Sequence, residues 1–250
     1  MRTVDFVIIF TQALPSTTRR HPPAHQIGGV QEKANRMIDL NLVVERLLDD
    51  AVKLYGNRDQ QADKSVIDAI ARKDPNQSPE ARQGEVFKWL RSYSVFRGLE
   101  DADASAVVSE ILKFADDSNL GVIPTSKEEI IGLFNDLHER CRSKVHRNKD
   151  GTLRDLTSLT SKALWCCYPE AIPLFDSRAG RGLCVLSHLM SSNRPPRKND
   201  LRYEPFLTVW LELYRRVEPT IDENRDRLGQ IRHKVRVFDA ILWMIGGPDF

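Results

Sequence analysis

The chain has 250 residues, of which 41% are hydrophobic and 29% are charged, a composition that can bury the core of one domain or of two small ones. No apolar run approaches the roughly 18 residues that a membrane-spanning helix needs, which argues against an integral membrane protein. The 37 basic and 35 acidic residues give a formal net charge of +2. The chain is therefore not a general polycation, and any surface for nucleic acid must be a local patch.

The N-terminal residues are not expected to form a secretory signal. Their apolar run, Phe6–Phe10, is short, follows Asp5 and lacks a small-residue cleavage site. We therefore expect a soluble intracellular protein. Residues 4–10 are the only stretch whose alternation could form a strand. Residues 11–30 are rich in proline and histidine, and residues 1–30 are expected to form a flexible arm.

Apolar side chains recur at helical spacing through most of the chain, which predicts an all-α fold. The predicted helices, in chain order, include residues 37–55, 85–96, 107–114 and 130–147 and lie near 160–168, 177–190, 204–217 and 221–245. Gly56 ends the first helix, and Pro79 suits a first helical turn. Thr125–Glu128 and Ser126–Glu129 both fit a capping box for the fourth helix.

We expect residues 31–250 to form one all-α domain, because no internal repeat divides them. Two helical lobes, about 31–125 and 126–250 with the site between them, are compatible with the same pattern. No glycine-rich phosphate loop is present in the sequence, which argues against a nucleotide hydrolase.

The cysteines do not form a metal-binding pattern. Cys166 and Cys167 are adjacent, whereas Cys141 and Cys184 stand alone, so the sequence has no zinc-binding pair of the CxxC type. We expect reduced, structural thiols. No metal and no other cofactor is expected.

The most informative segment lies between residues 151 and 183. Leu156–Ser161 is polar and is expected to form a hairpin that leads directly into a helix. That helix is expected to stop before Pro169 and to be followed by an extended stretch, Ile172–Phe175. Asp176 then stands where it can cap the next helix.

Lys162 and Asp176 are the two candidate functional residues of this segment. A lysine at the start of an apolar helix is unusual, because the helix dipole disfavours a cation there, and this suggests a functional role. A lysine that faces solvent is the alternative interpretation. Asp176 has an equally simple alternative as a helix cap, although its apolar neighbours place it near the core.

This segment resembles the helix-hairpin-helix DNA glycosylases, in which a hairpin of the type L-P-G-V-G-x-K leads into a helix and an apolar stretch ending in V-D follows. Leu156-Thr-Ser-Leu-Thr-Ser-Lys162 falls on the hairpin, and Ile172-Pro-Leu-Phe-Asp176 falls on the aspartate stretch. The string SK-ALW-YP-IPLFDSR is also similar to a divergent bacterial branch with an 8-oxoguanine DNA glycosylase-type fold. Some members of that branch are phage-defence proteins that attack modified viral DNA.

The resemblance implies a DNA glycosylase that flips a modified base out of double-stranded DNA and excises it, leaving an abasic site. In lyase-active members a lysine stands at the position of Lys162, and the aspartate at the position of Asp176 is essential. A carboxylate near the sugar can stabilise an oxocarbenium-like transition state, and a deprotonated lysine can form a Schiff base at C1′. The expected location is the bacterial cytoplasm, on the nucleoid when DNA is bound.

The DNA contacts would come from hydroxyls and from a local basic surface. Ser158 and Thr160 stand where the family has glycines that approach a phosphate, so Ser158, Thr160 and Ser161 would contact DNA through their hydroxyls. Arg178 and Arg181 belong to a basic group at residues 178–202, and a second group lies at residues 140–162. Such a surface predicts binding that weakens steeply with salt.

The sequence shows no sign of an obligatory protein partner for a glycosylase, and two further interpretations stay open. A catalytically inactive DNA-binding module of a defence or regulatory system would explain the replaced glycines. It would also explain why Lys162 and Asp176 are 14 residues apart, about one helical turn closer than in the familiar enzymes. The third interpretation is an all-α interaction protein in which both residues are incidental.

Overall fold

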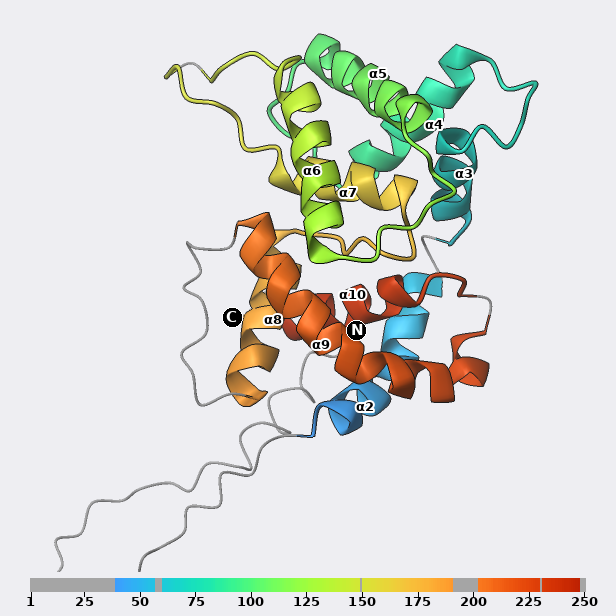
Figure 1. The fold of residues 1–250 in the computed structure, drawn as a ribbon, viewed down its shortest axis with the longest axis vertical. Coiled ribbons are helices and arrows are strands. Elements are labelled where there is room, and N and C mark those ends of the chain that lie inside the picture. The colour runs from blue at the N-terminus through green and yellow to red at the C-terminus, as the bar shows by residue number, and fades with distance from the viewer. Residues whose placement is uncertain (1–38, 57–59, 149, 191–201, 230, 248–250) are drawn as a thin grey trace, which may run out of the picture. The chain divides into compact units, whose positions relative to one another are not determined.

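Helices make up most of the described part of the chain, as Figure 1 shows. The computed structural model describes residues 39–56, 60–148, 150–190, 202–229 and 231–247. Within these residues it contains nine α-helices and no strand, which confirms the all-α prediction. The described residues all belong to one compact unit, residues 37–250. The predicted arm at 1–30 and the candidate strand at 4–10 lie outside the described residues.

The helices follow one another in the order α2 to α10. Their bounds are α2 Leu40–Gly56, α3 Gln60–Ile70, α4 Pro79–Ser92, α5 Asp101–Asp117, α6 Lys127–Arg142, α7 Thr157–Cys167, α8 Ser177–Met190, α9 Tyr203–Glu223 and α10 Lys234–Ile245. A short 3-10 helix, η2 (Arg225–Leu228), lies between the last two. No helix of the described residues is long and apolar enough to cross a bilayer.

Local signals place several helix starts as predicted. Pro79 occupies the first turn of α4, and the Ser78 hydroxyl accepts a hydrogen bond from the backbone of that turn. Ser126 and Glu129 form a complete capping box at the start of α6, each side chain bonding the backbone N–H of the other.

Three helix predictions need correction. α3 is missed by the sequence pattern because its buried face includes the carboxylate of Asp63. α6 ends at Arg142 rather than at residue 147. The single helix predicted at 221–245 is wrong, because α9 stops at Glu223 and Gly229, with a φ of 59°, turns the chain before α10 begins.

The described helices pack in two groups. In one group the successive helices α3 to α7 contact each other, and α7 also contacts α3 and α4. In the other group α10 packs against α2 and α8, and α2 packs against α9. Figure 1 shows α2, at the start of the described chain, beside the late helices α9 and α10. The expected lobe boundary near residue 125 falls between α5 and α6, which pack against each other.

Glycines allow α8 and α10 to approach at backbone distance. A Cβ added to Gly182 of α8 would overlap the Leu242 carbonyl oxygen of α10. A Cβ added to Gly246 would overlap the Arg178 carbonyl oxygen of α8. This close crossing fixes the first turn of α8 against the end of α10, and the candidate site lies at that turn.

Candidate active site

The polar stretch before Lys162 is helical. The hairpin predicted at Leu156–Ser161 is wrong, because α7 begins at Thr157 and residues 157–161 form its first turn and a half. Asp155 accepts a hydrogen bond from the Thr157 N–H, and the Ser161 hydroxyl donates to the Ser158 carbonyl. These bonds let a serine- and threonine-rich run start a helix that the sequence pattern places at a turn.

α7 is buried on all sides from Leu159 to its end at Cys167. A helix that is buried all round belongs to the core rather than to the surface. Lys162 therefore lies in the second helical turn inside the core, and the argument from an unfavourable helix dipole at its position does not apply.

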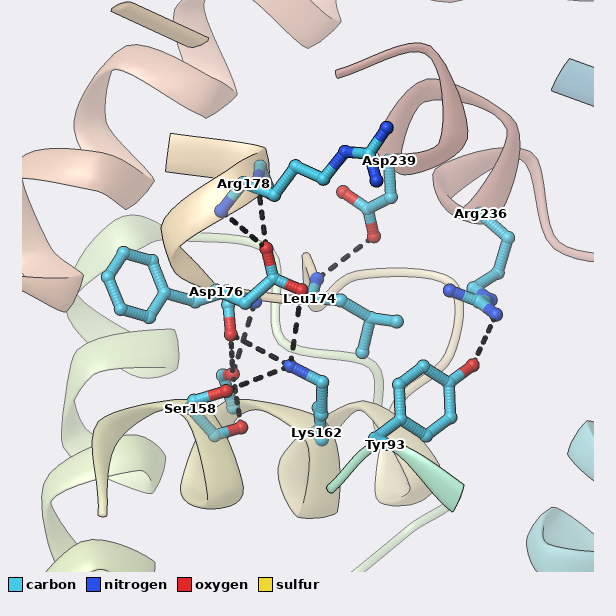
Figure 2. Close-up of polar contacts among 11 residues, drawn as sticks. Tyr93, Ser158, Lys162, Leu174, Asp176, Arg178, Arg236 and Asp239 are labelled. Carbon is cyan, nitrogen blue, oxygen red and sulfur yellow. Dashed lines mark hydrogen bonds and ion pairs between the residues drawn. The ribbon is translucent and has the colours of Figure 1, made fainter. Parts of the chain in front are cut away.

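The Lys162 ammonium is enclosed by oxygen atoms, as Figure 2 shows. Its side chain is 2% exposed, and Nζ donates to Ser158 Oγ at 2.9 Å and to the Phe175 carbonyl at 3.0 Å. Asp176 Oδ2 lies 3.6 Å from Nζ. Burial lowers the pKa of Lys162, the Asp176 carboxylate opposes that shift, and the Arg236 guanidinium adds to it.

Asp176 makes two kinds of contact at once. Its Oδ1 accepts hydrogen bonds from the backbone N–H of Arg178 at 2.9 Å and of Ala179 at 2.8 Å, which confirms the predicted cap of α8. Its other oxygen faces Lys162. The Asp176 side chain is 31% exposed, so the carboxylate lies between the buried amine and solvent.

The extended segment Ile172–Asp176 brings the aspartate to the lysine. Because this segment belongs to no helix, its backbone groups need other partners. The Leu174 N–H donates to Asp239 Oδ2 at 2.9 Å, and the Phe175 N–H donates to Ser161 Oγ at 3.1 Å. The side chains of α7 and α10 thus hold the backbone next to Asp176.

A buried ion pair lies on the other side of Lys162. Arg236 of α10 bonds Asp63 of α3 at 3.1 Å and donates to the Tyr93 hydroxyl at 2.7 Å. Its guanidinium lies 5.1 Å from the Trp165 ring centroid, and Lys162 Nζ lies 5.7 Å from the Tyr93 ring centroid. A fixed cation and an aromatic ring therefore lie close to the buried amine (Figure 2).

The hydroxyls predicted to contact DNA are mostly inside the protein. Thr160 and Ser161 are fully buried, so neither offers a surface to a phosphate. Ser161 instead bonds the Ile172–Asp176 segment, and the buried Thr160 hydroxyl has no hydrogen-bond partner among the described residues. Ser158 is half-buried and accepts from Lys162. Of the three, Ser158 alone reaches the surface near Asp176.

The two predicted arginines attach α8 to the end of α10. Arg178 Nε donates to the Trp243 carbonyl at 2.7 Å, and its guanidinium lies 3.3 Å from the centroid of the exposed Trp243 ring. Arg181 donates to the Gly246 carbonyl at 3.0 Å. Both side chains are half-buried, and burial lowers the pKa of Arg178. They are ordered cations beside Asp176 with a clear structural function of their own.

Part of the other predicted basic surface is neutralised within the described residues. Several cations of the 140–162 group are paired with carboxylates: Arg140 with Asp117 and Asp136, Arg142 with Glu139, and Lys144 with Glu110. Residues 191–201 of the second group lie outside the described residues. The part of the basic surface closest to the site is therefore Arg178 and Arg181.

The sequence interpretation missed Asp63, Arg236 and Asp239. An arginine and an aspartate within the apolar run of α10 are the available signal, because charged residues are rarely fully buried without partners. Their partners lie on distant helices, so the sequence does not identify them.

No set of three or more His, Cys, Asp or Glu side chains in the described residues is placed to hold a metal ion. The four cysteines are free, and burial raises the pKa of Cys141 and Cys167 to about 12. Buried thiols of this kind are structural rather than nucleophilic at neutral pH. Comparisons of the chain with protein families, curated proteins and solved structures gave no match.

Proposed function

We propose that this protein is a DNA glycosylase that excises a modified base and leaves an abasic site. The observation that carries the proposal is the pairing of a fully buried lysine with a half-buried aspartate: Lys162 Nζ lies 3.6 Å from Asp176 Oδ2. These are the two residues that the resemblance to helix-hairpin-helix glycosylases selects. They lie on different elements, 14 residues apart in the chain, and nevertheless meet at the start of α8.

Asp176 would act on the sugar of a flipped nucleotide. Breaking the N-glycosidic bond develops positive charge on the sugar ring, which a nearby carboxylate stabilises. Two backbone N–H groups of α8 fix Oδ1, so the carboxylate is oriented before substrate arrives. Its exposure gives a nucleotide access to the outer side of the pair.

Lys162 has two possible parts in the reaction. Burial favours the neutral amine. For the amine to act as nucleophile, the Asp176 side chain that covers it must turn aside. The lone pair of the amine then forms a bond to C1′ while the C1′–base bond breaks, and the base leaves with the electrons of that broken bond and takes up a proton. Loss of an amine proton and opening of the sugar ring then give a Schiff base. In a monofunctional enzyme water attacks instead, and the Lys162 ammonium orients Asp176.

The substrate follows from the resemblance alone. Because the similar bacterial branch includes proteins that attack modified phage DNA, we propose modified bases of phage DNA as the substrate and phage defence as the role. Arg178 and Arg181, the cations nearest to Asp176 on α8, would contact the DNA backbone.

The test is incubation of the purified protein with phage genomic DNAs that carry different modified bases, beside unmodified DNA. Abasic sites are counted with an aldehyde-reactive probe, and borohydride traps any lysine adduct. We expect abasic sites on one DNA only. Asp176→Asn, which keeps a capping side chain, should abolish them while folding is retained. Lys162→Gln should remove any adduct, whereas Lys234→Gln, a control at a lysine paired with Glu218 and Asp222, should not.

A catalytically inactive DNA-binding module is the second candidate. The burial of the Lys162 ammonium among three oxygens favours it, because a structural ion pair has the same geometry. Salt-dependent DNA binding without abasic sites on any DNA would support this candidate and refute the glycosylase. Absence of both binding and excision would leave the interaction protein.

A further inference from the structure

Asp239 is a buried carboxylate at the centre of the contacts that hold Ile172–Asp176. Its side chain lies on α10, which also carries Arg236 one turn earlier. One carboxylate oxygen accepts from the Leu174 N–H at 2.9 Å, and the other accepts from Trp210 Nε1 at 3.1 Å. Figure 2 shows the Leu174 bond directly beside Asp176. Burying a carboxylate is costly, so a simple apolar residue would pack α10 more favourably.

We propose that Asp239 is a positioning residue: by accepting the Leu174 N–H, its carboxylate holds the segment Ile172–Asp176 so that Asp176 faces Lys162. The bond lies two residues from Asp176 and anchors the segment from the α10 side. Ser161 anchors the neighbouring Phe175 N–H from the α7 side. The segment is thus held by hydrogen bonds to two helices. The effect of these bonds on catalysis rests on the proposed function, whereas their effect on the stability of the segment can be measured without DNA.

The charges around Asp239 determine how the stability of the closed segment Ile172–Asp176 changes with pH. Burial raises the pKa of Asp239 to about 7, against the Leu174 N–H, the Arg236 guanidinium and the Trp210 N–H, which lower it. Several titratable groups of the described residues interact electrostatically with the Asp239 carboxylate. They lie on three helices and on the segment: Arg236 on α10, Lys162 on α7, Tyr203 and Tyr214 on α9, and Asp176 on the segment.

Opening of the segment hydrates Asp239 and returns its pKa toward the ordinary value near 3.9. The open form then releases the Asp239 proton at lower pH than the closed form does. Opening therefore becomes easier as the pH rises toward about 7 and becomes independent of pH above that value. The burial of Asp239 in the closed segment thus predicts protection that falls over this range and then levels off, and Asp239→Asn tests the bond to Leu174 itself.

The experiment is amide hydrogen exchange of residues 172–176 in the full chain between pH 5 and pH 8, corrected for intrinsic exchange rates. We expect the protection of Leu174 and Phe175 to fall by up to about tenfold per pH unit below pH 7 and to be constant above it. In Asp239→Asn the protection should be at least about tenfold lower at pH 5 and independent of pH.

A matched control is Asp103→Asn. Asp103 is also a buried carboxylate with two hydrogen bonds, to His146, but it lies on α5 and does not contact the segment. It should leave the protection of 172–176 unchanged. Trp210→Phe keeps the Asp239 carboxylate and removes one donor, so the pH at which protection levels off should move upward.

Equal protection and equal pH dependence in the wild type and Asp239→Asn would overturn the inference. If Asp239→Asn does not fold, the pH dependence of the wild type and its shift in Trp210→Phe decide the matter. With a substrate DNA, Asp239→Asn should lower kcat at least about tenfold and leave KM unchanged, because positioning acts after binding. If no DNA is a substrate, the proposed function fails and the exchange result still decides the role of Asp239.

Discussion

Replacement of Lys162 by methionine separates a functional lysine from a structural one. Methionine has a similar volume and fills the same buried space without charge. The groups that contact Nζ all keep other partners or reach water. Ser158 is half-buried, and Asp176 keeps its two backbone donors. The Phe175 carbonyl keeps the Ser161 hydroxyl at 3.3 Å, which it shares with the Ser158 carbonyl. The substitution therefore weakens the hydrogen bonding of one buried carbonyl and leaves no buried charge without a partner.

The expected change in the free energy of unfolding follows from two opposing contributions. Each hydrogen bond from a charged donor contributes about 1.5–3 kcal/mol, so loss of the two bonds from Nζ costs about 3–6 kcal/mol. Removal of a buried cation relieves a desolvation penalty of several kcal/mol. Because the two contributions are of similar size, Lys162→Met should be within about 1 kcal/mol of the wild type. If Lys162 is needed to compensate the charge of Asp176, the loss should instead be about 3–5 kcal/mol.

Urea unfolding followed by circular dichroism and tryptophan fluorescence measures this difference. Leu164→Ala, a cavity substitution at a fully buried position of the same helix, should lower the free energy of unfolding by about 2–5 kcal/mol and shows that the assay detects α7 packing. A loss of 3 kcal/mol or more in Lys162→Met, without a change in the slope of unfolding, would refute the reasoning.

The same lysine gives the stability of the wild type a definite pH dependence. Because the pKa of Lys162 is lowered in the folded state, the unfolded chain binds more protons between that lowered pKa and about 10.4. Stability should therefore rise with pH through this window. Lys162→Met should remove that contribution, which a series of urea titrations from pH 6 to pH 10 can detect.

Three further substitutions test the packing around the site. Gly182→Ala should lower the free energy of unfolding by about 3 kcal/mol or more, because the added Cβ overlaps a backbone oxygen of α10. The thermal midpoint should fall with it, and an unchanged midpoint would contradict the close crossing of α8 and α10. Arg236→Met should cost about 3–5 kcal/mol in urea unfolding because it leaves Asp63 as an uncompensated buried charge, and a double variant with Asp63→Asn should regain part of this loss. Ser126→Ala should cost about 1 kcal/mol by the same assay through loss of the α6 capping box, and a loss above 3 kcal/mol would indicate another role.

Local chemistry determines which parts of the fold can be predicted from the sequence. The capping box at Ser126 and the Asp176 cap of α8 involve residues two or three positions apart, so the pattern identifies both. The start of α7 depends on whether serine and threonine hydroxyls bond within a helix or within a turn. Both arrangements satisfy the hydrogen bonding of these hydroxyls, so the sequence favours a turn where the structure has a helix.

Local sequence patterns cannot identify the partners of the buried charged residues at the site. Arg236 and Asp63 pair across 173 residues, and Asp239 contacts Leu174 across 65. A charged residue in an apolar run signals that a partner exists, but only the packing of α10 against its neighbours shows which residue the partner is. The spacing between Lys162 and Asp176 is a weak guide for the same reason.

α10 contacts the surroundings of both members of the candidate pair. Asp239 accepts a hydrogen bond from Leu174, two residues before Asp176, and Arg236 donates to the hydroxyl of Tyr93, whose ring lies 5.7 Å from Lys162 Nζ. A separation about one helical turn shorter than in the familiar glycosylases does not keep the two apart, because Lys162 Nζ reaches the Phe175 carbonyl at 3.0 Å, at the residue next to Asp176.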